Sequence, residues 1–480
     1  MYPNTQLFID GAWTDSAANK TIDVANPATG ETIAEYKTLD ANGIDAKLEA
    51  ATRAYRDWRT SPVEHRTQLL ARLSELYLER KEELARLAVT EMGKPITQAR
   101  SEVEKCASLF AYLAEHGPPM LESEFWELSD GGRAEGRWLP QGPVLAVMPW
   151  NFPYWQVVRF LAPTILAGNV GVLKHASIVQ GVAHKMEELV LEAGAPEGLF
   201  QNLCVSSDPI SDVIADTRIV AATLTGSEGA GSDVAAQAGK HLKKVVLELG
   251  GSDPFIVMPS ADIDKAVEDA VFARIQNNGQ SCICGKRTVV HADIHDTFAD
   301  KFITALKAIE PGDPMNDDTK LGPLSSEGQR DTVLEQVEKA KQEGCTLLFG
   351  AEKLDRAGAW MTAGLLTDVP LASETGTDEI FGPVGQIYKA KDIEEAITIA
   401  NAIPFGLGST VWTRDEEERE IFANRIEAGM TTFNAVNGSK IEAPFGGIKK
   451  SGFGRELSHH GLHEFMNLKT LVYPAEGQSA

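Results

Sequence analysis

The sequence predicts an α/β protein made of two β/α units, and three observations carry this expectation. The chain has 480 residues, a length typical of two or three domains. Short apolar runs alternate with amphipathic segments over residues 142–247, which indicates a parallel sheet with helices on both faces. A second series of this kind begins at residue 253, after Gly250 and Gly251. Such sheets bind ligands at the carboxyl ends of their strands.

The residues before the first series predict a short strand and three helices. Residues 7–13 are typical of a strand. Apolar residues at three- and four-residue spacing predict helices over residues 45–59, 68–92 and 96–116. Residues 122–141 are polar and interrupt this pattern. We therefore expect them to leave the first unit as an excursion.

The two series contain the following expected elements. The first has strands at 142–148, 170–174, 200–204, 219–225 and 243–247, and helices at 153–166, 179–193, 210–215 and 231–239. The second has strands at 253–257, 288–290 and 346–349, and helices at 263–277, 294–309 and 326–343. Residues 470–480 predict an extended strand followed by a frayed end.

Composition and charge exclude several classes of function. There are 45 Lys and Arg against 69 Asp and Glu, a formal net charge of −24. This charge argues against a general nucleic-acid binder or a protein that docks on anionic membranes. Residues 144–173 are apolar, but three prolines and Arg159 within them make a membrane helix a poor interpretation. Five cysteines and an N-terminus without a basic or apolar leader segment predict a cytoplasmic protein.

Cys282 is the candidate nucleophile. A cysteine is most often a small buried apolar residue, but Asn278-Gly-Gln-Ser-Cys282 surrounds this one with poor core residues. Glycine gives close access to the backbone, and neighbouring N–H groups can stabilise a thiolate or an oxyanion. Because these features suit a reactive thiol, we expect Cys282 to be catalytic.

Two polar residues in apolar surroundings are candidates for the base and the oxyanion donor. Glu248 lies in a predicted strand, where a carboxylate is either ion-paired or kept protonated by a raised pKa. It is therefore a structural ion-pair partner or a general base. Asn151 stands between Pro149 and Pro153, where it either caps a turn or donates its amide to an oxyanion.

A glycine-rich segment is the candidate cofactor loop. Thr225-Gly-Ser-Glu-Gly-Ala-Gly231 follows a predicted strand and opens a helix, as phosphate-binding loops do. It does not match the GxGxxG fingerprint of dinucleotide-binding folds, so the segment alone is weak evidence.

Taken together, these motifs resemble the aldehyde dehydrogenase superfamily over nearly the whole chain. The resemblance includes Pro149-Trp-Asn-Phe-Pro153, Leu247-Glu-Leu-Gly-Gly251 and Gly279-Gln-Ser-Cys282, and it continues through Glu379-Ile-Phe-Gly-Pro-Val384 and Pro444-Phe-Gly-Gly447. It implies a Rossmann-like cofactor-binding domain, an α/β catalytic domain and a small β oligomerisation arm. The implied limits are 1–121 with 142–247, then 248–445, then 122–141 with 446–480.

The resemblance also implies a reaction. Cys282 would attack an aldehyde to form a thiohemiacetal, with its oxyanion held by Asn151 and the Cys282 N–H. Loss of hydride would leave a thioester, and Glu248 would activate the water that hydrolyses it. A nucleophile, a base and an oxyanion donor are the parts that acyl chemistry requires. A coenzyme-A-acylating relative and a non-catalytic relative are the alternatives.

The resemblance places the cofactor, NADP or NAD, against seven residues. Family members specific for NAD often carry a glutamate where this chain has Ser177. Without that carboxylate, Lys174 is free to pair with a 2′-phosphate, which favours NADP, although Glu228 lies nearby. The implied cofactor-binding residues are Trp150, Lys174, Ser177, Gly226, Ser227, Glu379 and Phe381.

The Trp150-Asn-Phe-Pro153 motif followed by Arg159 resembles the succinate-semialdehyde dehydrogenase subgroup. In that subgroup an arginine at this place holds the distal carboxylate of the substrate, and a guanidinium suits that contact. Many members carry a second arginine where this chain has Gln276, so a broader aldehyde preference is an open alternative. Three other residues are candidates to compensate for it: Arg274, Ser439 and Lys440.

The remaining cysteines and a histidine cluster complete the expectations. Cys284 is a candidate redox partner of Cys282, and the two thiols supply too few ligands for a metal. His459, His460 and His463 lack the spacing of a metal motif. We expect no metal, a small anionic aldehyde as substrate, and a homodimer or homotetramer. Three other cysteines are expected in the core: Cys106, Cys204 and Cys345.

Overall fold

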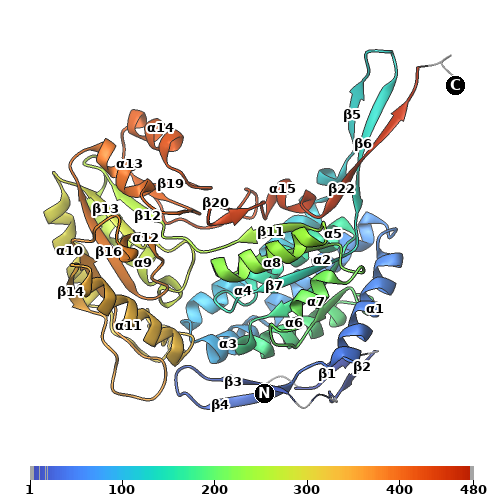
Figure 1. Cartoon of the computed structure of the whole chain (residues 1–480), viewed down its shortest axis with the longest axis horizontal. Coiled ribbons are helices and arrows are strands. Elements are labelled where there is room, and N and C mark those ends of the chain that lie inside the picture. Colours follow the sequence, from blue (N-terminus) through green and yellow to red (C-terminus); the bar gives the residue numbers. More distant parts are fainter. Residues whose placement is uncertain (1–4, 10, 17, 19, 476–480) are drawn as a thin grey trace.

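The computed structural model describes residues 5–9, 11–16, 18 and 20–475, and it has the α/β fold that the sequence predicts. Figure 1 shows two β/α units side by side, with a narrow arm of strands rising above one of them. The last five residues, where a frayed end was expected, lie outside the described residues, as does Asp10 in the first predicted strand.

The N-terminal segment differs from the prediction at two places. Residues 7–13 belong to a hairpin in which Leu7 pairs with Thr14, rather than to one strand. The single helix expected over residues 68–92 is two helices that meet at Arg80, whose φ of −102° and ψ of 13° leave the helical region. Apolar spacing continues across Arg80, so the pattern does not mark the break. The elements are β1 (Leu7–Ile9), β2 (Ala12–Thr14), β3 (Thr21–Ala25), β4 (Thr32–Lys37), α1 (Ala41–Trp58), α2 (Val63–Glu79), α3 (Lys81–Met92) and α4 (Ile96–His116).

The first unit is a six-stranded sheet in the order β21-β11-β10-β7-β8-β9. All pairs are parallel except that of β21 with β11. Its strands are β7 (Pro143–Met148), β8 (Val170–His175), β9 (Phe200–Asn202), β10 (Ala221–Thr225), β11 (Lys244–Glu248) and β21 (Gly452–Phe453). Its helices are α5 (Trp155–Ala167), η2 (Ser177–Val179), α6 (Gln180–Glu192), α7 (Ile210–Ala215) and α8 (Glu228–Lys240).

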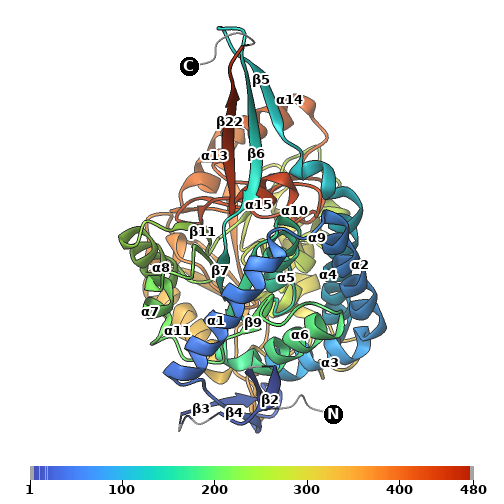
Figure 2. The same cartoon turned by 90° about the vertical axis from the view of Figure 1, so that its right-hand side faces the viewer.

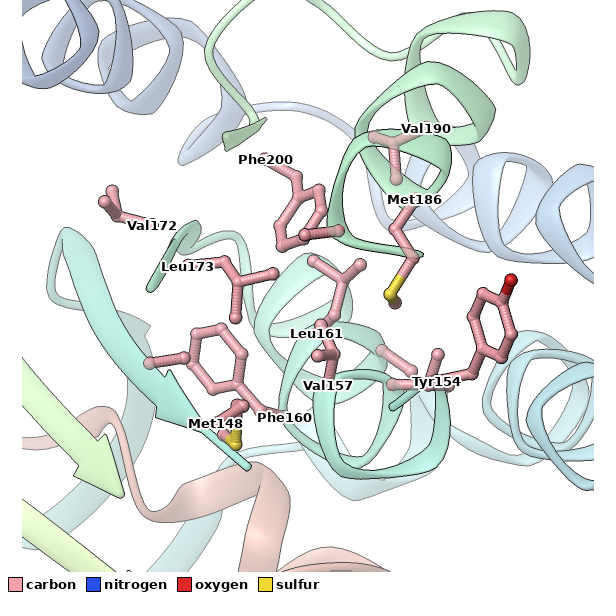
Figure 3. Close-up of a cluster of buried hydrophobic side chains, with 14 of the residues drawn as sticks. Met148, Tyr154, Val157, Phe160, Leu161, Val172, Leu173, Met186, Val190 and Phe200 are labelled. Atoms are coloured by element: carbon pink, nitrogen blue, oxygen red, sulfur yellow. The ribbon is translucent and has the colours of Figure 1, made fainter. Parts of the chain in front are cut away.

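Packing of α5 on this sheet forms the centre of the core. Every residue of α5 is buried, which explains why this segment is apolar without crossing a membrane. Figure 3 shows Phe160 and Leu161 of α5 beside Leu173 of β8 and Met186 of α6. Within the described part of the chain, none of the helices is both long enough and apolar enough for a membrane crossing.

The second unit is a seven-stranded sheet in the order β14-β15-β16-β13-β12-β18-β19, parallel except for β14. Its strands are β12 (Pro254–Val257), β13 (Arg287–His291), β14 (Thr346–Gly350), β15 (Gly364–Thr367), β16 (Val384–Ala390), β18 (Thr410–Trp412) and β19 (Thr432–Phe433). Its helices are α9 (Ile263–Ile275), η3 (Gln276–Gly279), α10 (His295–Lys307), α11 (Glu327–Gln342), α12 (Glu374–Thr377), α13 (Ile393–Asn401) and α14 (Glu416–Arg425).

The polar excursion is a hairpin that pairs with the C-terminal strand. In Figure 2 the three strands project from the body of the molecule. His463 stacks on Trp138 at the base of this arm, with ring centroids 3.7 Å apart, so that histidine has a structural contact. The elements of this region are η1 (Pro118–Leu121), β5 (Glu124–Glu127), β6 (Arg133–Pro140), α15 (Ser458–His463) and β22 (Met466–Tyr473). A separate short antiparallel pair is formed by β17 (Phe405–Gly406) and β20 (Ile448–Lys449).

Candidate active site

The loop that carries Cys282 is held by an unusual backbone and by buried hydrogen bonds. Asn277, Asn278 and Gly279 all have positive φ, at 53°, 59° and 75°. Asparagine and glycine adopt this conformation most readily. A Cβ on Gly279 would lie 2.3 Å from the carbonyl carbon of Gly382, so only glycine fits there. The glycine noted in the sequence is therefore required by close backbone packing.

Two buried side chains fix this loop in place. Asn278 donates its amide to the carbonyls of Gly93 (2.9 Å) and Pro323 (2.7 Å) and accepts from the Gly322 N–H. The Lys286 ammonium donates to the carbonyls of Ser281 (2.7 Å) and Cys282 (2.6 Å). The loop is thus tied to α3, to the segment before α11 and to β13.

The Cys282 thiol is half-buried and protonated at neutral pH. Burial raises its pKa to about 12, although Lys286 and Arg159 oppose that rise. A thiol in this state needs a base before it can attack a carbonyl. The Cys282 N–H donates no hydrogen bond to another described residue, which leaves it available to an oxyanion.

Asn151 lies directly against this loop. Its side-chain amide donates to the Gln280 carbonyl (3.2 Å), and its own carbonyl accepts from the Asn277 amide (2.8 Å). Among the described residues its Oδ1 has no partner. Its side chain therefore bonds across the two units rather than capping its own turn. Asn151 therefore lies against the loop that carries Cys282, and its role as oxyanion donor stays a prediction.

Glu248 ends β11 as a buried carboxylate without an ionic partner. Within the described residues, neither oxygen accepts a hydrogen bond, and the side chain is 2% exposed. Burial raises its pKa well above the usual range, Glu456 adds to the rise, and Arg159 and Arg455 oppose it. The ion-paired alternative is therefore wrong for Glu248, and the tuned base fits the geometry.

A cavity of about 390 Å³ opens onto Cys282. It also receives Arg159, Gln276 and Ser439, so the nucleophile and three of the predicted substrate-site positions share one space. Its full lining is Thr97, Gln98, Ser101, Glu102, Lys105, Phe152, Trp155, Gln156, Arg159, Phe272, Gln276, Ser281, Cys282, Ile283, Asn437, Gly438, Ser439 and Phe445.

Arg159 is buried on α5 and already has a carboxylate partner. Its Nε lies 2.7 Å from Glu456, and it also contacts the Gln156 side chain. Its guanidinium stands 4.4 Å from the centre of the Phe445 ring. The sequence does not reveal Glu456 as the partner of Arg159, because Glu456 lies 297 positions further along the chain and no local pattern pairs the two.

Of the three candidates to compensate for Gln276, only Ser439 lines the cavity. Arg274 is buried and donates to the carbonyls of Gly279 and Gly382, both at 2.9 Å, so it supports the loop and does not line the cavity. Lys440 is exposed and outside the lining. Ser439 does line the cavity, where its hydroxyl accepts from Lys105 (2.7 Å).

Lys105 is the second site residue that the sequence does not reveal. It lies on α4 between buried Glu102 and Cys106, three residues after the first and one before the second. A lysine within an otherwise buried stripe of a helix was the available signal. Its ammonium lies 4.4 Å from the Trp155 ring centre and inside the cavity lining.

The predicted cofactor residues lie mainly at the carboxyl ends of the strands of the first sheet, which form the edge that faces the Cys282 loop. β7, β8, β10 and β11 are parallel, so Trp150, Lys174, Gly226 and Glu248 all stand at carboxyl ends of strands. Ser227 caps α8 by accepting from Ala230, and exposed Ser177 begins η2.

Two predicted cofactor residues come from the second unit. Phe381 meets Trp150 edge to face, with ring centroids 5.7 Å apart. Glu379 forms an ion pair with Lys286 (2.9 Å). The two units therefore meet at this edge, between the cofactor residues and the Cys282 loop.

The remaining cysteines are buried or lie beside the nucleophile. Cys106, Cys204 and Cys345 are buried, as predicted. Cys284 is also buried, with its sulfur 3.7 Å from the Gln276 carbonyl, and its pairing with Cys282 stays a prediction. Nowhere in the described residues do three His, Cys, Asp or Glu side chains gather as metal ligands would.

Comparison with known proteins decides the family. The model of the aldehyde dehydrogenase family matches residues 13–471. The chain belongs to the aldehyde dehydrogenase family. Two curated relatives are succinate-semialdehyde dehydrogenases [NADP(+)] 1, from Mycobacterium tuberculosis (strain ATCC 25618 / H37Rv) and Mycobacterium ulcerans (strain Agy99). They are 47% and 46% identical, over 93% and 94% of this chain and 98% and 99% of theirs.

Solved structures of aldehyde dehydrogenases agree with this assignment. The succinic semialdehyde dehydrogenase from Streptococcus pyogenes, in complex with NADP+, superposes with a TM-score of 0.92 at 39% identity. That match covers 94% of this chain and 100% of the other. An aldehyde dehydrogenase from Brucella melitensis biovar abortus 2308 has a TM-score of 0.94 at 30% identity, over 99% and 98% of the two chains. The fold class predicted from the sequence is confirmed.

Proposed function

We propose that this protein oxidises succinate semialdehyde to succinate with NADP+, through a covalent intermediate on Cys282. The observation that carries the proposal is the cavity in which Cys282 shares one space with Arg159 and Lys105. An aldehyde with a distal carboxylate needs a nucleophile at one end and positive charge at the other. The names of the mycobacterial relatives and the streptococcal structure support this choice of substrate and coenzyme.

The proposed reaction has the following order of events. Glu248 takes up the Cys282 proton, since its raised pKa makes it a stronger base than an ordinary carboxylate. The sulfur then bonds to the aldehyde carbon, and the carbonyl electron pair moves to the oxygen. The Asn151 amide and the Cys282 N–H hold that oxyanion.

A nicotinamide coenzyme held by the sheet-edge residues would supply the hydride acceptor, and loss of hydride from that carbon leaves a thioester on Cys282. Glu248 releases to solvent the proton that it took and then removes one from water. The hydroxide bonds to the thioester carbon, the C–S bond breaks, and Cys282 is released with succinate. Because Glu248 has no ionic partner among the residues that the structure describes, its carboxylate is free for both proton transfers.

Residues at the edge of the first sheet fit NADP+. Lys174 has no carboxylate within ion-pair distance in the described part of the chain, so its charge is available to a phosphate. Glu228, the nearby acid that opposed this choice, lies 3.6 Å from Lys450 and is partly neutralised. A Cβ on Gly229 would meet open space, so the first turn of α8 is accessible.

Steady-state kinetics over charged and neutral aldehydes, with NADP+ and NAD+ in separate series, tests the proposal. We expect the highest kcat/KM with succinate semialdehyde and NADP+, and acid as the product without coenzyme A. Equal kcat/KM for butanal, the uncharged four-carbon aldehyde, would instead establish the broad-specificity alternative. Acid formation that requires coenzyme A would remove the hydrolytic role of Glu248.

The arm supports a homo-oligomer, which we place in the cytoplasm. Its three-stranded sheet presents Phe125 (64% exposed), Trp126 (43%) and Val472 (62%) to solvent. Large apolar side chains gathered on a projecting sheet favour contact with another surface. Light scattering should give a dimer or tetramer, and Phe125→Lys with Val472→Lys should shift it toward the monomer.

A further inference from the structure

The three charged residues that line the cavity differ in whether they have an ion-pair partner. Glu102 forms a buried ion pair with Lys94 and accepts from the N–H groups of Tyr154 (2.8 Å) and Trp155 (2.9 Å). Arg159 pairs with Glu456. The third charged residue of the lining is Lys105.

Among the described residues, Lys105 is the lining charge without a counterion. In the described part of the chain its ammonium donates only to the neutral Ser439 hydroxyl and stacks over Trp155. Since the Glu102 and Arg159 charges are each balanced by a partner, Lys105 gives the cavity its net positive charge. A half-buried ammonium has lost part of its hydration, so a carboxylate partner stabilises it strongly.

A second group in the same cavity also lacks a partner. The Gln276 Nε2 is buried and makes no hydrogen bond to the described residues. It stands where the sequence lacks the expected arginine, and it supplies an N–H donor but no charge. A substrate carboxylate would therefore meet an ammonium, a hydroxyl and an amide donor.

We propose that Lys105 pairs with the distal carboxylate of the substrate and thereby selects carboxylate-bearing aldehydes, with Gln276 and Ser439 as neutral donors. This inference rests on the proposed function. Arg159 then serves mainly to balance the buried Glu456, which lies next to Glu248. Its removal would strand that carboxylate and damage turnover of every aldehyde, so Arg159→Ala cannot isolate substrate binding.

Lys105→Met is the decisive variant, since it keeps the length of the side chain and removes the charge. We expect kcat/KM for succinate semialdehyde to fall about 10- to 100-fold, mainly through KM, as for loss of a charged hydrogen bond. Turnover of butanal should stay within about twofold of wild type, which also shows that the variant is folded. Lys105→Arg should restore most of the preference.

Lys440→Met is the matched control, because it removes a lysine charge near the cavity but outside its lining. It should leave the ratio of the two kcat/KM values unchanged. Succinate, tested as a competitive inhibitor of the NADP+-bound enzyme, should bind more weakly to Lys105→Met and Lys105→Gln by the same factor. Unchanged inhibition in both variants would overturn the proposal.

The pH dependence separates Lys105 from the other titrating groups. Burial lowers the Lys105 pKa to about 8; Arg159 and Lys440 act in the same direction, and Cys106 and Glu102 oppose them. The succinate semialdehyde to butanal ratio should fall above about pH 8, where the ammonium loses its proton. Titration of Cys282 and Glu248 affects turnover of both substrates alike, so it cancels in the ratio of the two kcat/KM values. Lys105→Arg should remove this fall.

The outcomes distinguish the two proposals. A wild-type enzyme that prefers succinate semialdehyde, with a Lys105→Met variant that keeps this preference, overturns the role of Lys105 and leaves the proposed function intact. A wild-type enzyme without that preference overturns both. Equal losses for the charged and the neutral aldehyde would make Lys105 a structural residue only.

Discussion

The Cys282 loop and the facing edge of the first sheet differ in how their key side chains are paired: Asn278 and Lys286 of the loop have several partners, whereas Glu248 and Lys174 of the edge lack a charged partner among the described residues. On the loop, Asn278 uses both ends of its amide, and Lys286 donates to two carbonyls and pairs with Glu379. On the sheet edge, Glu248 has no partner among the described residues, and Lys174 has no carboxylate there.

This difference assigns separate tasks to the two regions. The hydrogen bonds of Asn278 and Lys286 hold the nucleophile in one position, whereas an unsatisfied buried carboxylate costs stability and gains reactivity. Substitutions on the edge should therefore change chemistry without loss of stability, and substitutions that support the loop should do the reverse. The following predictions test that division, starting with the nucleophile itself.

Cys282→Ala should abolish aldehyde oxidation, with a loss of about 10⁴-fold or more in kcat, as expected when a nucleophile is removed. The loop is held by Asn278 and Lys286, so its fold should persist, with an unfolding temperature close to wild type. Initial rates and thermal unfolding measure the two quantities. Full turnover in this variant would exclude the covalent mechanism.

Glu248→Gln should lower kcat about 10²- to 10⁴-fold, the usual contribution of a general base. If the substitution slows hydrolysis more than it slows activation of the thiol, single-turnover measurements should still detect the acyl-enzyme. The variant should be as stable as wild type or more so near pH 8. The pKa of Glu248 is higher in the folded protein than in the unfolded one. Between these two pKa values, a rise in pH therefore lowers the stability of the wild type, and the neutral Gln side chain avoids this loss.

A marked loss of stability in Glu248→Gln would contradict the comparison. It would mean that the carboxylate is satisfied in solution, and that the sheet edge resembles the loop. Glu187→Gln is the control, because Glu187 is also buried but pairs with Lys47 (2.6 Å), and its loss should destabilise the fold.

Local pattern predicted most elements, and it failed where no local signal marks the structure. The spacing of α4 placed that helix at residues 96–116 without error, and the unusual surroundings of Cys282, Glu248 and Asn151 predicted them as site residues. The break at Arg80 leaves no trace in apolar periodicity, because neither Gly nor Pro marks the point where the backbone leaves the helical region.

Which charge of the cavity lacks a partner could not be predicted from the sequence for the same reason. Whether Lys105 or Arg159 is free depends on Glu456, which reaches α5 only in the folded chain. The roles of the site residues and the domain limits near residues 121, 142, 248 and 446 stay predictions. Residues 452–453 were assigned to the C-terminal segment, but they form β21, the outermost strand of the first sheet.

Asn278→Ala should destabilise the fold by about 3 kcal/mol, since it leaves three buried groups unpaired and places alanine at a positive φ. Urea unfolding measures this change. Asn278→Gly is the control: it removes the same hydrogen bonds but accepts the φ of 59°, so it should recover about 1 kcal/mol. Stability equal to wild type in both variants would show that the loop is not held by this side chain.

Ser177→Glu should give the smallest effect, about a 10-fold rise in KM for NADP+ with little change for NAD+, because the added carboxylate repels a 2′-phosphate and pairs with Lys174. Ser177 is exposed, so the fold should not change. Ser108→Glu adds the same charge on an exposed face of α4 and is the control for net charge. If both coenzymes weaken equally, then Lys174 is not the group that recognises the phosphate, and the available charge on the sheet edge serves another part of the coenzyme.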